Sequence, residues 1–470
     1  MNALQRDLAR LVSRVEREDG PAVAADPARQ AFHLMPPVGW LNDPNGLCKY
    51  EGFYHVFYQY GPFDPNGGVK HWGHYRSADL VHWEQLPVML YPDQPFDLHG
   101  VYSGSAYVED GVMYLYYTGN VKFAGDHDYI RTGRGHNTCL AVSHDGKTAV
   151  SKQCLMENKD YPEALSCHVR DPKVWRQDGR YYMVQGARTL DDRGEVLVFA
   201  SDDKLHWEHI RTITTPDPFG YMWECPDLFE LDGQWFLAVS PQGLAQDGLA
   251  YQNVYACGYF PLYGDFREDC TLGAFQEFDK GFDFYAPQSF SDGARRIQLG
   301  WMGMPDADYV NPTAQNGWQH CMSVPCVLTA RDGMLLRTPA PELEALRGAC
   351  DAFVVTDGTA RTGVCFDLTY TPDGPFSIAV RDSLVLEYEA GVFTMRFAAG
   401  GAGRTVRRAA AERLHSLRVL ADRTSVEVFL NDGETVLSTR FYPDPACCAL
   451  RFVRGGGQAS LYPMHHPEEK

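Results

Sequence analysis

The stretch WLNDPNGLCKYEGFYHVFYQY, residues 40–60, contains a pattern that the chain then repeats. A polar motif, Asn42-Asp43-Pro44, is followed by the turn dipeptide Glu51-Gly52 and then by an aromatic and β-branched run. Four later segments keep this order: Ser103-Gly104-Ser105 with Asp110-Gly111, Arg170-Asp171-Pro172 with Asp178-Gly179, Glu224-Cys225-Pro226 with Asp232-Gly233, and Tyr285-Ala286-Pro287 with Asp292-Gly293. The turn glycines lie 59, 68, 54 and 60 residues apart. This period is too long for a helical solenoid and is typical of four-stranded propeller blades with loops.

Each repeat is predicted to be a strand, a tight turn and a second strand. An acidic residue followed by glycine supplies the positive φ angles of a hairpin turn, and aromatic runs bounded by turn residues are typical of buried strands. These runs are residues 53–60, 112–118, 180–185, 234–240 and 297–302. Around one axis, the residues at the same offset before each turn would face one central funnel: Asp43, Ser103, Asp171, Glu224 and Tyr285. Asp before Pro is also a common turn opener, but three acidic residues at one offset favour a functional site.

Composition narrows the class of protein. The 42 basic and 61 acidic residues give a formal charge of −19, which disfavours nucleic acid and anionic membranes as partners, although solubility also explains it. Thirteen cysteines without a Cys-x-x-Cys pair or a Cys/His cluster predict no metal site, no cofactor and a reducing compartment. No signal peptide or membrane-spanning apolar stretch is recognisable, so a cytoplasmic location is expected. A homo-oligomer is left open.

Three regions differ from the repeats. Leu4, Leu8, Leu11 and Val15 recur at helical spacing and predict an amphipathic helix over residues 3–18, ending near Gly20-Pro21. The segment PAPELEALRG, residues 339–348, predicts a short linker helix. Alternating strands after residue 351, with the hairpin turn Asn431-Asp432-Gly433, predict a β-sandwich. The expected organisation is an all-β chain with an N-terminal helical extension (1–30), a five-bladed β-propeller (31–335), a linker helix (336–350) and a β-sandwich (351–470).

Several motifs together resemble the invertase-like enzymes of glycoside hydrolase family 32. They are WLNDPNG at 40–46, HWGHYRS at 71–77, YSGS at 102–105, HVRDP at 168–172, GYMWECPDLF at 220–229, GFDFYAPQ at 281–288, GWMG at 300–303 and DRTSVEVFLNDGE at 422–434. The resemblance implies a five-bladed propeller joined to a β-sandwich, and it covers all but the N-terminal helix. HVRDPKV, GYMWECPDLF and NGWQH are most similar to bacterial intracellular members that act on sucrose 6-phosphate. Tyr102 departs from the family's usual phenylalanine and adds a hydroxyl at the rim of the predicted pocket.

The resemblance also implies roles for the acidic residues. Family members are retaining enzymes, which use a carboxylate nucleophile and a second carboxyl group as general acid and base. Asp43 matches the nucleophile and Glu224 the acid and base, which neighbouring carboxylates are expected to keep protonated near neutral pH. Asp171 matches the residue that stabilises the transition state, and the adjacent Arg170 is expected to keep it charged and oriented.

Further positions match the wall of the fructose site. They are Asn42, Gln59, Trp72, Ser103, Arg170, Tyr285 and Trp301. Aromatic residues are 13% of the chain, so core packing is the alternative for each ring. His71 and His74 lack an acidic or cysteine partner at ligand spacing and are interpreted as structural hydrogen-bonding residues, and Cys225 as a packing residue beside the acid.

The predicted reaction is hydrolysis of terminal β-D-fructofuranosyl residues from sucrose or sucrose 6-phosphate, so the expected partner is a small sugar. A phosphate on the leaving glucose would favour basic residues, and the segment 119–138 offers Lys122, Arg131, Arg134 and His136, unless it is simply a solvated loop. Fructooligosaccharides remain alternative substrates. An inverting pentose-releasing glycosidase and a non-catalytic sugar-binding propeller are the rival functions.

Overall fold

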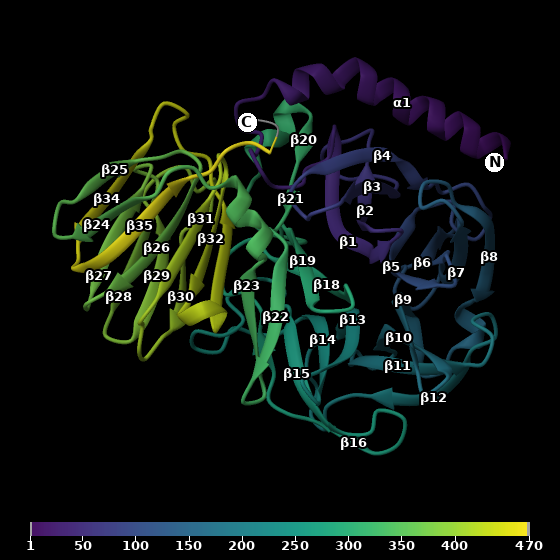
Figure 1. Ribbon diagram of the computed structural model, residues 1–470. Coiled ribbons are helices and arrows are strands. Elements are labelled where there is room, and N and C mark those ends of the chain that lie inside the picture. Colours follow the sequence, from purple (N-terminus) through teal and green to yellow (C-terminus); the bar gives the residue numbers. More distant parts are fainter. Residues whose placement is uncertain (1, 468–470) are drawn as a thin grey trace.

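The structure is a computed structural model that describes residues 2–467, and its strands pair antiparallel except for β1 with β20. Five small sheets form the part of the chain before residue 340, and two six-stranded sheets form the part after residue 350 (Figure 1). Within residues 2–467, no helix is both long enough and apolar enough to cross a membrane. The chain is therefore mainly β, as the sequence predicts.

The five small sheets follow the five repeats. The first contains β1 (Gly39–Tyr50), β2 (Phe53–Gly61), β3 (His71–Ser77), β4 (Trp83–Leu90) and the distant β20 (Trp318–Gln319). The second contains β5 (Val101–Glu109), β6 (Val112–Lys122), β7 (Arg134–Ser143) and β8 (Val150–Met156). The third contains β9 (Leu165–Gln177), β10 (Arg180–Thr189), β11 (Gly194–Ser201) and β12 (Glu208–Ile213). Each predicted aromatic run in these sheets lies in the second strand.

The remaining two small sheets are less regular. One contains β13 (Met222–Leu231), β14 (Gln234–Gln242), β15 (Gly258–Gly264), β16 (Cys270–Leu272) and β17 (Gln276–Glu277). The other contains β18 (Tyr285–Ser291), β19 (Arg296–Met302), β21 (Cys321–Met322), β22 (Cys326–Arg331) and β23 (Met334–Pro339). Four of the five turn dipeptides have positive φ at both residues, whereas Asp292 instead accepts backbone hydrogen bonds from Ala294 and Arg295. The fifth turn is correspondingly longer.

The first strands of the five sheets contact one another in a closed ring. The contacts run from β1 to β5, β9, β13 and β18 and back to β1, and Figure 1 shows the sheets following one another around a common centre. The parallel pairing of β20 with β1, Gly39 opposite Trp318, joins the end of this region to its beginning. Residues that are far apart in sequence therefore meet at the centre of the ring.

The C-terminal region forms a sandwich-like pair of sheets. One contains β24 (Asp351–Val355), β35 (Gly457–Pro463), β26 (Phe366–Pro372), β31 (Leu417–Ala421), β32 (Ser425–Leu430) and β33 (Thr435–Arg440). The other contains β25 (Ala360–Thr362), β34 (Ala449–Arg454), β27 (Phe376–Val380), β28 (Leu384–Glu389), β29 (Val392–Phe397) and β30 (Val406–Ala410). Phe282 and Phe397 pack at 5.6 Å between ring centres and join the two regions in one hydrophobic core.

The helical segments differ from the prediction. Helix α1 (Ala3–Ala24) continues through Gly20 and Pro21, because burial of Val23 and the hydrogen bond from Ala25 N to Pro21 O hold its last turn. The predicted linker helix is only the 3₁₀ helix η3 (Pro341–Leu346), since residues 334–339 already belong to β23. Three further 3₁₀ turns are η1 (Asn158–Asp160), η2 (Pro312–Asn316) and η4 (Asn431–Gly433), the last of which connects β32 to β33 as the predicted hairpin turn.

Candidate active site

Irregularities in the five inner strands position the side chains of the site. Each of these strands shifts register with its neighbour at the repeated motif, for example between Leu41 and Pro44 in β1 and between Glu224 and Asp227 in β13. Such bulges re-aim side chains, which explains why the same offset in each repeat faces the centre. Asp171 and Cys225 adopt positive φ angles of 65° and 49°, a backbone strain often found at functional sites.

The inner strands surround a cavity of about 350 Å³. Its walls contain all five residues predicted at the common offset, together with most of the predicted binding residues. The lining residues are Trp40, Asn42, Asp43, Gln59, Lys70, Tyr102, Ser103, Arg134, Arg170, Asp171, Glu224, Gln242, Tyr285, Trp301, Met304, Pro305 and Asp306. Three sheets thus each contribute one carboxylate to a single cavity.

Asp43 is held by two polar side chains. The Ser103 hydroxyl donates to Asp43 Oδ2 at 2.6 Å, and Gln59 Nε2 donates to the same oxygen at 3.2 Å. Gln59 also bonds to Ser103. Burial raises the pKa of Asp43, while the Ser103 hydrogen bond opposes that effect and the charge of Glu224 reinforces it. Both of these bonds are to Oδ2, and the carboxylate lines the cavity, where a ligand can reach it.

Glu224 receives hydrogen bonds from three different elements. Arg170 donates from Nε and Nη2 to Glu224 Oε1, at 3.2 and 2.6 Å. On the other oxygen, Oε2, Tyr285 donates its hydroxyl at 2.6 Å and Gln242 its amide at 2.9 Å. Gln242 lies at the end of β14, two residues beyond the partner of Glu224 in the ladder, so the hairpin register was the signal that could have identified it.

Arg170 is shared between two carboxylates. It was expected to keep Asp171 charged and oriented, and its Nε lies 3.9 Å from Asp171 Oδ2, but its shorter contact, at 2.6 Å, is with Glu224. Asp171 Oδ2 accepts a hydrogen bond from the backbone N–H of Cys225 at 2.9 Å. Burial raises the pKa of Asp171 to about 7, with the charge of Glu224 adding to the effect and Arg170 opposing it. The nearest cation therefore does not keep this carboxylate fully ionised.

The aromatic wall contains Trp40 and Trp301, whose ring centres are 5.9 Å apart. The indole N–H of Trp40 donates to Asn42 Oδ1 at 2.6 Å, which orients that amide. Trp72 does not line the cavity, in contrast to the prediction. It is fully buried and donates its indole N–H to the carbonyl of Tyr102, so it supports the wall from behind.

The histidines of the HWGHYRS segment lie in the core. His74 bonds to His55 at 2.9 Å, and His71 bonds to the carbonyl of Val69. Burial lowers the pKa of His71 to about 4 and that of His74 well below its usual value, so both are neutral. Their positions are consistent with the structural interpretation. Across residues 2–467, no group of three or more His, Cys, Asp or Glu side chains is arranged to hold a metal ion.

The predicted basic segment divides into different environments. Arg131 is exposed and pairs with Asp192 at 3.1 Å, outside the cavity. Lys122 lies over the ring of Tyr129, and His136 is fully buried. Only Arg134, the first residue of β7, lines the cavity. Lys70, in the loop before β3, lines the same cavity and was not predicted.

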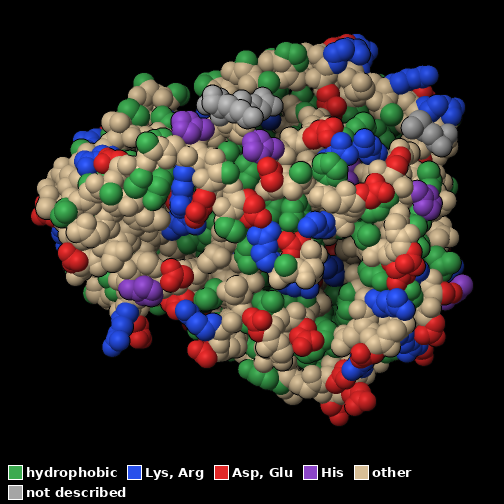
Figure 2. Space-filling model, viewed as in Figure 1, with side chains coloured by type: hydrophobic (Ala, Val, Ile, Leu, Met, Phe, Trp, Pro, Cys, Tyr) green, Lys and Arg blue, Asp and Glu red, His purple; other side chains and the backbone are tan. Residues whose placement is uncertain are grey.

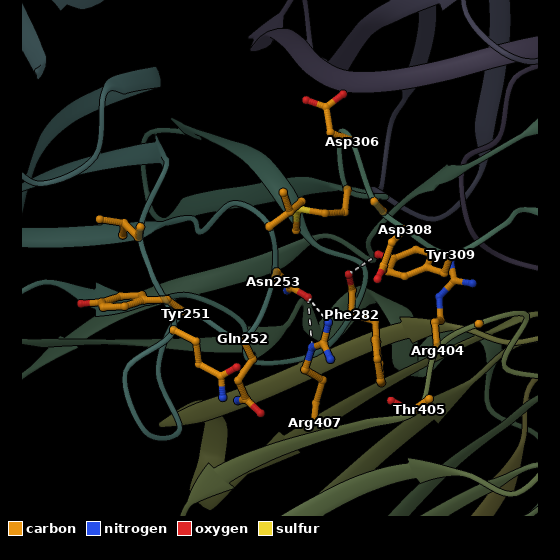
Figure 3. Close-up of a pocket in the computed structure, with 16 residues that line it drawn as sticks. Tyr251, Gln252, Asn253, Phe282, Asp306, Asp308, Tyr309, Arg404, Thr405 and Arg407 are labelled. Carbon is orange, nitrogen blue, oxygen red and sulfur yellow. Dashed lines mark hydrogen bonds between the residues drawn. The ribbon is translucent and has the colours of Figure 1, made fainter. Parts of the chain in front are cut away.

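A second cavity of about 470 Å³ lies between the two regions of the chain (Figure 3). Met304 and Asp306 line both cavities, so the loop after β19 forms a wall between them. Arg407 donates to Asn253 Oδ1 at 2.7 Å inside the second cavity.

Figure 2 shows acidic and basic side chains interspersed over the visible face rather than gathered by sign.

Sequence comparison assigns the family. The N-terminal domain of glycosyl hydrolases family 32 matches residues 33–339, and the C-terminal domain of the same family matches residues 356–466. The chain belongs to glycosyl hydrolase family 32. A sucrose-6-phosphate hydrolase of Bacillus subtilis is 41% identical over 467 residues, covering 95% of each chain. A raffinose invertase of Escherichia coli is 36% identical over 92% of this chain and 93% of its own.

Family 32 structures also match the fold. A sucrose-6-phosphate hydrolase of Lactobacillus gasseri superimposes with a TM-score of 0.89 at 28% identity, covering 97% of this chain and 96% of its own. A mutant β-fructofuranosidase of Bombyx mori, solved in complex with sucrose, gives a TM-score of 0.86 at 28% identity, with 99% of both chains covered. The likeness extends over both regions of the chain.

Proposed function

We propose that this family 32 protein hydrolyses terminal β-D-fructofuranosyl residues from sucrose and its 6-phosphate ester, with retention of configuration. The observation that carries the proposal is the convergence of Asp43, Asp171 and Glu224 in one cavity whose walls also present amide, hydroxyl and indole groups. Retaining glycosidases need two carboxyl groups, one as nucleophile and one as general acid and base. A sugar is bound by planar polar groups and by aromatic ring faces. The names of the similar family members agree with this chemistry.

Asp43 is the proposed nucleophile. One of its carboxylate oxygens attacks C2 of the fructosyl unit as the bond from C2 to the glycosidic oxygen breaks, and an ester between Asp43 and fructose forms. Ser103 and Gln59 fix the other oxygen and limit the rotation of the carboxylate. In the second half of the reaction, a water oxygen attacks the same carbon and releases the carboxylate.

Glu224 is the proposed general acid and base. It gives a proton to the leaving glycosidic oxygen and then takes one from the attacking water. Arg170, Gln242 and Tyr285 fix its side chain in one position for both transfers. Burial raises the pKa of the neighbouring Asp43 and raises that of Asp171 to about 7.

Asp171 is the proposed stabiliser of the transition state. Positive charge develops on the fructosyl ring as the leaving group departs. An adjacent carboxylate in a buried site stabilises that charge strongly. The same charge favours ionisation of Asp171, which is only partly ionised near neutral pH in the free site. The contribution of Asp171 is thus largest in the transition state.

The proposed fructose-binding residues remain Asn42, Gln59, Ser103, Arg170, Tyr285 and Trp301, and Trp72 supports them from behind.

We also propose that the five small sheets are the blades of a five-bladed propeller and that the C-terminal pair is a β-sandwich. The ring of first strands and the β20–β1 closure support that count. The propeller was predicted over residues 31–335 and is proposed to run to residue 339, because β23 (Met334–Pro339) belongs to its last sheet, while the sandwich keeps the predicted bounds of 351–470. A cytoplasmic location and a homo-oligomer stay predictions.

Purified protein incubated with sucrose and with sucrose 6-phosphate provides the test. The wild type is expected to release fructose, and NMR should show that the β-anomer forms first. Asp43→Asn is expected to release none. Initial formation of the α-anomer would favour the inverting rival, and binding without turnover would favour the non-catalytic one. Faster cleavage of short fructooligosaccharides than of either sucrose form would identify the alternative substrate class.

A further inference from the structure

We infer that Arg134, together with Tyr102 and Lys70 of the same cavity, forms an anion subsite that recognises a phosphate on the leaving sugar. This inference rests on the proposed function and adds to it the residues that determine substrate choice. All three side chains line the cavity that contains the three carboxylates. Arg134 is the principal residue, because its guanidinium has donors available for an anionic partner.

Arg134 differs from the buried arginines of the described chain. Four of these arginines contact carboxylates, namely Arg170, Arg337, Arg404 and Arg440. The fifth, Arg381, donates to three backbone carbonyls. Within residues 2–467, Arg134 has no carboxylate partner, and its Nε is buried without any hydrogen-bond partner. Its one polar contact is Nη1 to His136 Nε2 at 3.4 Å. Arg134 is only partly buried and lines the cavity, so its guanidinium keeps donors available for an anion that enters.

The groups around Arg134 do not supply that anion. Burial keeps His136 neutral, and Arg170, which lines the same cavity, is already bound to Glu224. The ring of Tyr102 lies 5.9 Å from that of His136, the residue that Arg134 contacts. A guanidinium fork together with a hydroxyl is the kind of donor set that binds phosphate oxygens.

Lys70 adds a second cation to the same cavity. Among the described residues it has no ion-pair partner, and its ammonium group lies 4.6 Å from the centre of the Trp40 ring. Burial lowers the pKa of Lys70 to about 8, with the charge of Asp43 opposing that effect. A phosphate entering the cavity would favour the charged form of the lysine, as any nearby anion does.

Asp306 adds a negative charge to the same cavity. It also lines the second cavity, where Figure 3 labels it, and it accepts a hydrogen bond from Tyr255 at 2.7 Å. A phosphate monoester is repelled by Asp306 and attracted by Arg134. A leaving sugar that carries a phosphate is therefore oriented, whereas an unphosphorylated one is not.

The test is the ratio of kcat/KM for sucrose 6-phosphate to that for sucrose. Arg134→Gln is expected to lower this ratio by roughly 10- to 100-fold, the loss typical of a hydrogen bond to a charged group. Arg134→Lys keeps the charge and should restore part of the ratio. Arg131→Gln is the matched control, because Arg131 is in the same segment but pairs with Asp192 outside the cavity; it should leave the ratio unchanged.

Product inhibition supplies a second readout. Glucose 6-phosphate should inhibit sucrose hydrolysis by the wild type far better than glucose or inorganic phosphate, and Arg134→Gln should lose that difference. Inhibition by inorganic phosphate alone would mean a general anion site and overturn the inference. Equal proportional losses on both substrates in Arg134→Gln would also overturn it while leaving the proposed hydrolysis intact. Absence of fructose release from either substrate in the wild type would overturn both.

Discussion

Two groups of buried carboxylates in this protein are built in opposite ways. At the contact between the two regions, Asp283 accepts hydrogen bonds from Arg404 at 2.8 and 2.9 Å and is also bound by Arg440. In the cavity, Asp171 has one backbone donor and its neighbouring arginine makes its shorter contact with Glu224. Burial raises the pKa of both groups, but the two arginines outweigh it for Asp283, whose pKa lies below its ordinary value. The two arginines thus compensate the charge of Asp283, whereas the charge of Asp171 is only partly compensated.

The charges of a second interdomain group are also compensated. His33 bonds to Asp422 at 2.8 Å and to Glu427 at 3.0 Å, all three being buried. Burial alone would lower the pKa of His33, but the two carboxylates raise it to about 9. His33 therefore stays protonated and joins the N-terminal segment to the C-terminal sheets.

The largest expected effect is on catalysis. Asp43→Asn and Glu224→Gln should each lower kcat by about 10⁴-fold or more, because each removes a group that forms or breaks a bond. Steady-state kinetics measure the loss, and circular dichroism checks that the fold is retained. A folded variant of either kind with a rate near that of the wild type would contradict the proposed roles.

The interdomain charges should instead control stability. Asp283→Asn leaves Arg404 and Arg440 buried without their shared partner, so we expect the free energy of unfolding to fall by about 3–5 kcal/mol. Urea unfolding measures this loss, and Asp178→Asn, an exposed residue in an ion pair with Arg267, is a matched control that should change little. A loss below about 1 kcal/mol for Asp283→Asn would remove the contrast between the two groups.

The pH dependence of the free energy of unfolding should show whether His33 is protonated. Its pKa is raised on folding, so its stabilising contribution is complete below about 6.5 and is lost as the pH rises through about 9. In His33→Gln this loss should be absent, and the stability difference from the wild type should shrink by up to ~3 kcal/mol across that window. A constant difference from pH 6 to pH 9 would show that His33 is neutral.

The effect of Asp171 should have the opposite sign. Because folding raises the pKa of Asp171, its ionised form destabilises the native state as the pH rises from about 4 through about 7. Asp171→Asn should therefore stabilise the protein by up to ~4 kcal/mol at pH 8 and by little at pH 4, while activity is largely lost. Destabilisation at pH 8 would show that the carboxylate is compensated in the native site.

The parts of the site that a local sequence pattern determines could be predicted from the sequence. The repeated turn dipeptides fixed the offset that brings Asp43, Asp171 and Glu224 together, because a hairpin turn sets the register of its strands. Lys70 and the partner of Arg170 could not be predicted, since loop conformation and the choice between two nearby carboxylates depend on the packing of separate sheets. The link from His33 to Asp422 joins residues 389 positions apart and leaves no local signal.

The boundaries of the helices show the same limit. Proline normally ends a helix, yet burial of Val23 carries α1 past Pro21, which only the tertiary structure reveals. Trp72 was assigned to the fructose wall on the resemblance of its segment, but the aromatic packing of β3 keeps it behind Tyr102. In both cases packing between distant segments overrides what the local sequence favours.

The most direct test of the proposed mechanism is to trap the intermediate. Glu224→Gln lacks the acid and base, so a fructosyl donor with a good leaving group, such as β-fructofuranosyl fluoride, should react with the enzyme and then hydrolyse slowly. Mass spectrometry of the digested protein should find one fructosyl unit on the peptide that contains Asp43. A fructosyl group on another residue, or turnover of the donor with no covalent adduct and with inversion, would contradict the mechanism.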